Sequence, residues 1–190
     1  MGSELTGLEW RLPSSATGPW PAAEVSFTAF DIYLSGSVDP ADRSLTFANN
    51  IVGPQTQVRS GALVIPVDSF PSGGSPNDFG FFIGFNPYLY SGSNLLLELR
   101  HTGFTGTSRS VDAIGTAIPG YGTLFSAAWT GSYAGLSGSQ GNFSVTRFTA
   151  APIPEPGSIL LLATGSVVGA WGLRSVRRIR RKRRSAKKVA

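Results

Sequence analysis

The sequence predicts an all-β ectodomain, an antiparallel β-sandwich or jelly roll, followed by one C-terminal transmembrane helix and a basic tail. Before residue 157 no stretch keeps the helical period of about 3.6 residues over three turns, whereas short alternating segments recur. Gly (24) and Pro (13) are frequent and follow no period, which is typical of a β fold with many turns. An uncharged run over residues 157–173 then leads into a dense Arg/Lys cluster.

The strand candidates rest on alternation and on the turn residues between them. Apolar residues over 25–34 change phase near residue 29, which predicts one strand with a bulge or a strand buried on both faces. In the segment 95–100, Leu95, Leu97 and Leu99 alternate with Glu98 and Arg100, so one face is expected in the core and a charged face in water. Further strands are predicted over residues 45–47, 57–67, 79–85 and 142–148.

Four segments follow from this pattern. We predict a β-rich ectodomain over 1–149, a Pro-rich linker over 150–156, a transmembrane helix over 157–173 and a cytoplasmic basic tail over 174–190. About 150 residues suffice for one hydrophobic core. The start of the chain is neither basic nor followed by an apolar run, so it does not resemble a signal peptide. An exported protein would need one, so either the chain is not exported or its start is misplaced or truncated; we expect the second, an N-terminally incomplete ectodomain.

The charges are segregated along the chain. Six arginines and all eleven acidic residues lie at or before Glu155, which gives this part a net charge of −5, and the other ten basic residues begin at Arg174. The basic character therefore belongs to the tail, and the ectodomain is not expected to bind nucleic acid. The sequence has no cysteine, which excludes disulfides, thiolate metal sites and a cysteine nucleophile.

The run over 157–173 predicts a membrane span. As a helix it would be about 25 Å long, inside the range that crosses a hydrocarbon core. The alternative, a soluble core helix, would need a polar face that this run lacks. We expect the first basic residues behind it to act as a stop-transfer signal and to keep the C-terminus cytoplasmic, in contact with anionic membrane lipid rather than nucleic acid. These are Arg174, Arg177, Arg178, Arg180 and Arg181.

Pro154 and Pro156 hold Glu155 in an extended conformation ahead of the span, as suits either a processing site or an ordinary linker. Pro154-Glu155-Pro156, the Leu-rich span and the terminal Arg cluster, in this order, resemble the PEP-CTERM sorting signal of Gram-negative bacteria, the substrate of exosortase. The resemblance implies export by the Sec route, an inner-membrane intermediate, cleavage near Pro154-Glu155-Pro156, and a mature protein at the cell surface or in the extracellular matrix. The basic tail is longer than the usual few arginines, and the expected leader is absent.

Catalytic chemistry is not predicted. His101 is the only histidine, no Gly-x-Ser-x-Gly elbow is present, and every lysine lies in the tail. His101 is expected to be a solvated or hydrogen-bonded strand-end residue. We predict no enzyme, no catalytic residue and no cofactor; a cleft pairing two carboxylates such as Asp31 and Glu98 would revive an enzymatic reading.

Two binding alternatives stay open. Calcium is a candidate ligand of Asp39 and Asp42 with Asn49 and Asn50, or of Asn77 with Asp78, although turn formation explains these residues more simply. Trp10, Trp20, Trp129 and the tyrosines form either a sugar-stacking surface or part of the core. We therefore predict an exosortase-processed surface or matrix protein with a structural, exopolysaccharide-associated role. The alternative is a carbohydrate-binding module on a permanently anchored protein.

Overall fold

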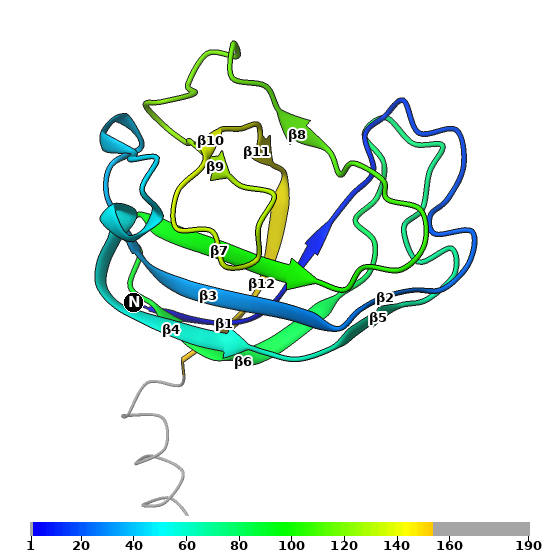
Figure 1. Ribbon diagram of the computed structural model, residues 1–190, viewed down its shortest axis with the longest axis horizontal. Coiled ribbons are helices and arrows are strands. Elements are labelled where there is room, and N and C mark those ends of the chain that lie inside the picture. Colours follow the sequence, from blue (N-terminus) through cyan, green and yellow to red (C-terminus); the bar gives the residue numbers. More distant parts are fainter. Residues whose placement is uncertain (1, 154–190) are drawn as a thin grey trace, which may run out of the picture. The chain divides into compact units, whose positions relative to one another are not determined.

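The computed structural model describes residues 2–153, and its strands pair antiparallel, which confirms the mainly β prediction (Figure 1). The strands are β1 (Ser3–Trp10), β2 (Val25–Phe27), β3 (Ala29–Ser37), β4 (Ile51–Arg59), β5 (Leu63–Ile65), β6 (Ile83–Tyr90), β7 (Leu95–Thr102), β8 (Ala113–Ile114), β9 (Ala128–Trp129), β10 (Ser139–Gln140), β11 (Phe143–Ser144) and β12 (Thr146–Pro152). Two single-turn 3₁₀ helices, Pro40–Asp42 and Phe47–Asn50, lie between β3 and β4.

Two three-stranded sheets supply much of the core, and the β2–β5 pair adds Val25, Leu63 and Ile65. The strand orders of the two sheets are β12-β1-β6 and β4-β3-β7. Leu8 and Trp10 of β1, Ile32 and Leu34 of β3, and Ile83 of β6 belong to one buried cluster. Because side chains alternate across a strand, each of these sheets contributes one face to that cluster. The sandwich or jelly-roll topology stays a prediction.

The phase change near residue 29 marks a change of sheet. β2 pairs with β5, whereas β3 pairs with β4 and β7, and the strands part at Thr28. The prediction of one continuous strand is therefore wrong. The strand predicted over 57–67 is also two strands, because the chain turns between β4 and β5 at Gly61, whose φ of +91° favours glycine.

Three other strand predictions need correction. The strand predicted over 142–148 is divided between β11, which pairs with β8, and β12, which pairs with β1. Residues 45–47 do not form a strand: Thr46 makes an isolated bridge to Ser137, and Phe47 begins a 3₁₀ helix. Buried Asn50 favours this turn, because its side chain bonds both the N–H and the carbonyl of Ser44. In the segment 79–85 the regular ladder begins only at Ile83; the preceding Phe79 makes an isolated bridge to Arg11.

Further predictions concern β7 and the C-terminal end of the described region. The strand predicted over 95–100 is confirmed as β7, and β12 continues four residues past Phe148 into the predicted linker. Among residues 2–153 no helix has the length and hydrophobicity to cross a membrane. The predicted membrane helix over 157–173 and the tail over 174–190 lie outside the described residues.

Candidate functional site

The outer face of the β4-β3-β7 sheet carries a cluster of polar and charged side chains. The β3–β7 register sets Asp31 opposite Arg100 and Tyr33 opposite Glu98. These four residues therefore share the face that points away from the buried row of Phe30, Ile32 and Leu34. The two carboxylates that sequence reasoning singled out do lie on one face of one sheet.

Asp31 is buried, with 5% of its surface exposed, and its carboxylate is held by two donors. The Gly61 N–H donates to one oxygen at 3.0 Å, and the Tyr133 hydroxyl donates to the other. This hydrogen bond is the main reason that the pKa of Tyr133 lies above its ordinary value. Asp31 also attracts the nearby Arg59 guanidinium, whose pKa is lowered by burial and partly restored by that attraction.

Glu98 has partners of its own. It accepts a hydrogen bond from Gln55 Nε2 at 2.7 Å and forms an ion pair with Arg100 Nε at 2.5 Å. The Arg100 guanidinium lies 5.5 Å from the centroid of the Tyr33 ring, a cation–π contact. Asp31 and Glu98 thus accept from different donors, and neither lines the cavities described below. Because these hydrogen bonds already use both carboxylates, the face resembles a structural network more than an acid–base pair.

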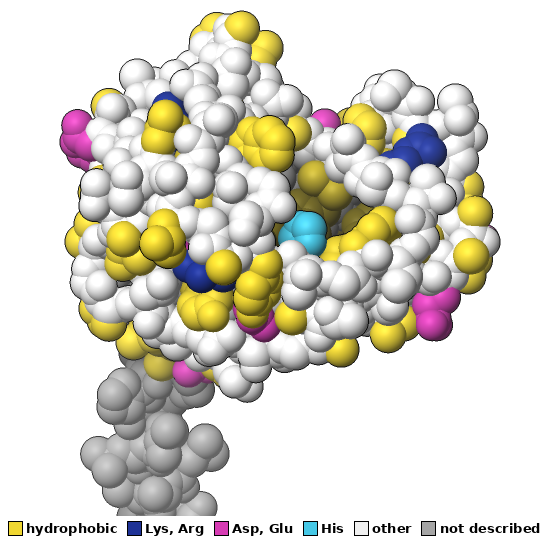
Figure 2. Space-filling model, viewed as in Figure 1, with side chains coloured by type: hydrophobic (Ala, Val, Ile, Leu, Met, Phe, Trp, Pro, Cys, Tyr) yellow, Lys and Arg dark blue, Asp and Glu magenta, His cyan; other side chains and the backbone are white. Residues whose placement is uncertain are grey.

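His101 ends the inward-facing row of β7 and packs on aromatic rings. Its ring stacks on Phe30 with centroids 5.9 Å apart and meets the edge of Phe27 at 5.2 Å. Burial lowers its pKa, so the neutral imidazole is favoured. Figure 2 shows the histidine at the mouth of a hollow with hydrophobic side chains on its floor.

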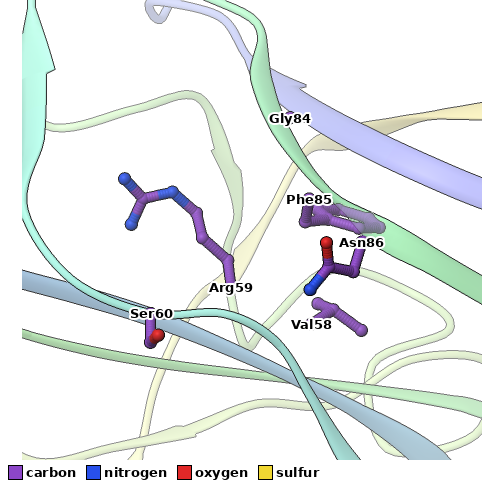
Figure 3. A pocket seen from close by; sticks show the side chains of 6 residues that line it. All are labelled: Val58, Arg59, Ser60, Gly84, Phe85 and Asn86. Carbon is purple, nitrogen blue, oxygen red and sulfur yellow. The ribbon is translucent and has the colours of Figure 1, made fainter.

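Two open cavities follow the line between β4 and β6, which are edge strands of different sheets. One, of about 430 Å³, lies between Val58 and Arg59 on one side and Phe85 and Asn86 on the other. In Figure 3 the Asn86 amide turns toward Val58, whereas the Arg59 guanidinium points away. That guanidinium donates instead to the carbonyls of Phe30, Gly61 and Ala62. The cavity therefore offers no free charged group.

The second cavity, of about 440 Å³, lies farther along the same two strands. Pro54 of β4 and Pro87 of β6 are among the residues that line it. Because proline has no N–H, these positions oppose the closing of the line by a hydrogen-bonded ladder. The cavities thus mark the place where two sheet edges meet without pairing.

Several of the side chains named as calcium candidates already have hydrogen-bond partners among the described residues. Asn50 bonds Ser44, and Asn77 donates to the carbonyls of Leu12 and Pro13 while accepting from Gly74 N–H. Asp39 accepts from the Asn94 amide at 2.6 Å. Within the described residues no group of three or more His, Asp or Glu side chains is arranged to hold a metal ion. Calcium binding stays a prediction without a geometry to support it.

The three described tryptophans have different environments. Trp10 is 7% exposed and donates to Thr146 Oγ1 at 2.9 Å, and Trp20 packs on Phe70 and donates to the Thr107 carbonyl at 2.9 Å. Packing therefore explains these two rings. Trp129 is different, because 61% of its surface is exposed. The structure does not arrange these three residues as one exposed aromatic row.

The last described strand, β12, ends at Pro152, two residues before Pro154 of the Pro154-Glu155-Pro156 tripeptide. β12 pairs with β1 up to Ser3 and Pro152, and the compact unit that holds every described strand ends at Pro152. A family model for the PEP-CTERM protein-sorting motif matches residues 152–178. The chain carries a PEP-CTERM protein-sorting motif. No match was found among curated proteins or among solved structures.

This match confirms the sorting signal inferred from the sequence, and it supports an exported protein of the cell envelope that exosortase processes. Pro154, Glu155 and Pro156 lie inside the matched segment, as do Arg174, Arg177 and Arg178. All of them, with Arg180 and Arg181, lie outside the residues that the structure describes.

Sequence reasoning missed Tyr133, Gln55 and Arg59 as partners in the polar network. Tyr133 lies in a Gly- and Ser-rich loop with no alternation, and its partner Asp31 is 102 residues away. Asp31 and Arg100 share a face because of the β3–β7 register, and no local sequence pattern reveals that register.

Proposed function

We propose that exosortase cleaves this chain near Pro154-Glu155-Pro156 and that the mature β domain then serves a structural, exopolysaccharide-associated role at the cell surface or in the extracellular matrix. Before cleavage the apolar segment 157–173 would hold the protein in the inner membrane, with Arg174 and the following basic residues on the cytoplasmic side against anionic lipid. The motif at residues 152–178 carries this proposal.

The position of that motif supports processing without damage to the fold. The matched segment begins at residue 152, where β12 ends. A cut at or beyond Pro154 would leave every described strand intact, including the β12–β1 pairing. Removal of the basic tail would also leave an acidic product, since residues 2–153 hold six arginines and ten acidic residues.

A non-enzymatic role fits the polar network of the β4-β3-β7 sheet. Asp31 and Glu98 accept hydrogen bonds from separate partners, and His101 packs against Phe27 and Phe30. These contacts favour stabilisation over turnover, because a general acid or base must be free to reach a substrate proton.

Mass spectrometry of the C-terminal peptide, in cells with and without the sorting enzyme, tests the proposal. We expect the mature chain to end near Pro154-Glu155-Pro156 only where the enzyme is present, and to fractionate with extracellular polysaccharide. A peptide that runs intact through Arg174 in enzyme-containing cells would instead identify a permanently anchored protein. Replacing Glu155 with Ala should block the cut, while the same change at Glu24, an exposed residue outside the motif, should not.

A further inference from the structure

Trp129 has an indole that the backbone supports from one side. The residue lies in β9 and pairs with Ser139 of β10, and its side chain is 61% exposed. A methyl group placed on the Cα of Gly141 would stand 2.5 Å from Cδ1 and 3.3 Å from Cγ of this indole. The ring therefore approaches the backbone more closely than any residue other than glycine at position 141 would permit. It leaves most of its remaining surface to solvent.

The indole N–H of Trp129 also differs from those of the other described tryptophans. Trp10 donates to Thr146 and Trp20 to Thr107. Within residues 2–153 the Trp129 indole N–H makes no hydrogen bond. Trp129 therefore offers an exposed aromatic ring together with an indole N–H that has no acceptor among the described residues.

The surrounding segment is free of charge. Residues 113–146 contain no Asp, Glu, Lys or Arg and are rich in Gly, Ser and Thr. A basic side chain does reach this segment from outside, because Arg43 donates to Gln140 Oε1 at 3.0 Å, but it already has this partner, and the described residues as a whole carry more acidic than basic groups. The net negative charge of the described residues thus favours neutral polar ligands over anionic ones.

We propose that Trp129 is a stacking platform for a pyranose ring of a neutral polysaccharide. A pyranose has an apolar face of C–H groups that packs against an aromatic ring, and its hydroxyls accept hydrogen bonds at the ring edge. Trp129 supplies both the aromatic surface and the N–H donor, and the absence of a side chain at Gly141 lets the indole lie against the backbone. This inference deepens the matrix role proposed above and rests on it for the biological source of the sugar.

Titration of the full chain with cellohexaose, in a detergent without a sugar headgroup, tests the platform. Calorimetry gives the affinity, and tryptophan fluorescence should shift to shorter wavelength as the indole is covered. We expect Trp129→Ala to weaken binding by roughly tenfold or more, as large aromatic anchors usually do. Gly141→Ala should also weaken binding while every aromatic residue is kept, because its methyl group displaces the indole.

Leu124→Ala is the matched control, because Leu124 lies in the same uncharged segment and is 80% exposed. It should bind cellohexaose like the parent chain. Circular dichroism melting of each variant separates a lost site from a lost fold, and a Trp129→Phe chain that keeps part of the affinity would support stacking.

Three results would overturn the platform. The first is parental affinity in a folded Trp129→Ala chain, and the second is no binding of cellohexaose or dextran by the parent chain. The third is self-association that Trp129→Ala abolishes without any sugar binding, which would assign the surface to a second copy. Tighter binding of oligogalacturonate than of cellohexaose would overturn the preference for neutral ligands. None of these results bears on exosortase processing, which the mass of the C-terminal peptide decides separately.

Discussion

The Tyr133 hydroxyl donates a hydrogen bond to the Asp31 carboxylate across 102 residues of sequence. Asp31 lies in β3 and is 5% exposed, whereas Tyr133 lies in the loop between β9 and β10. A buried carboxylate is costly unless donors surround it. The contact therefore both satisfies Asp31 and fastens this loop to the outer face of the β4-β3-β7 sheet.

Replacing Tyr133 with Phe should lower thermal stability, because Asp31 loses one of its two donors while the ring is kept. We expect the melting temperature to fall by roughly 2–4 °C. Differential scanning calorimetry at pH 7 measures it. Tyr88→Phe is the control, since no hydrogen bond joins the Tyr88 hydroxyl to the described residues, and equal melting of the two variants would contradict the role of Tyr133.

Alkaline pH should weaken the same contact. The pKa of Tyr133 is raised, chiefly by the hydrogen bond to Asp31, so the folded state retains the phenol proton more tightly than the unfolded state does. The stabilisation is complete below the unfolded pKa of about 10 and is lost as the pH rises through the folded value. Urea unfolding of the parent chain and of Tyr133→Phe should therefore converge above pH 10. A constant difference up to pH 11 would argue against this linkage.

The lowered pKa of His101 predicts that the free energy of unfolding decreases at mildly acidic pH. Burial lowers its pKa, so between the folded value and about 6.5 the unfolded chain binds more protons. The contribution of His101 is therefore full above the unfolded pKa and is lost as the pH falls through the folded one. Urea unfolding at pH 7.5 and 5.5 should show lower stability at 5.5, and His101→Asn should reduce this difference. An unchanged difference would assign the effect to other groups.

Prediction from the sequence succeeded where alternation was local and failed where partners were distant. β7 was recognised because Leu95, Leu97 and Leu99 keep one phase through the strand. β1 was not, because its buried Leu5 and Leu8 are three residues apart: a register shift between Leu5 and Gly7 breaks the alternation.

The sorting motif could be recognised from the sequence, whereas the polar network could not, because only the motif is local. Pro154-Glu155-Pro156, the apolar run and the Arg cluster are continuous in sequence, so their order alone identifies the signal that the family model matches. The network needs β3 beside β7 and a distant loop above both. Asp31 and Glu98 were noticed as carboxylates, but their donors Tyr133 and Gln55 depend on strand pairing that no local pattern shows.

Gly138 should be indispensable to the β9–β10 hairpin. A Cβ at this position would lie 2.0 Å from the Trp129 carbonyl oxygen, which is backbone and has little freedom to move, and 2.9 Å from Phe47 Cζ. Gly138→Ala should destabilise the protein by about 1–3 kcal/mol, as overpacking usually does. Gly131→Ala is the matched control, because a Cβ there meets nothing within 4 Å. Chemical denaturation compares the two, and equal stability would contradict the close approach.

The boundary at Pro152 predicts that the β domain does not depend on the residues that processing would remove. Every described strand, and all residues of the buried cluster, precede Ile153. A chain ending at Ile153 should therefore melt at the temperature of the full chain. A chain ending at Val145 should not fold, because it lacks β12, the Trp10–Thr146 hydrogen bond and the packing of Phe148 against the core. Circular dichroism of the three chains decides this. A clear loss of stability in the chain ending at Ile153 would show that the sorting segment supports the fold, and cleavage would then weaken the product it releases.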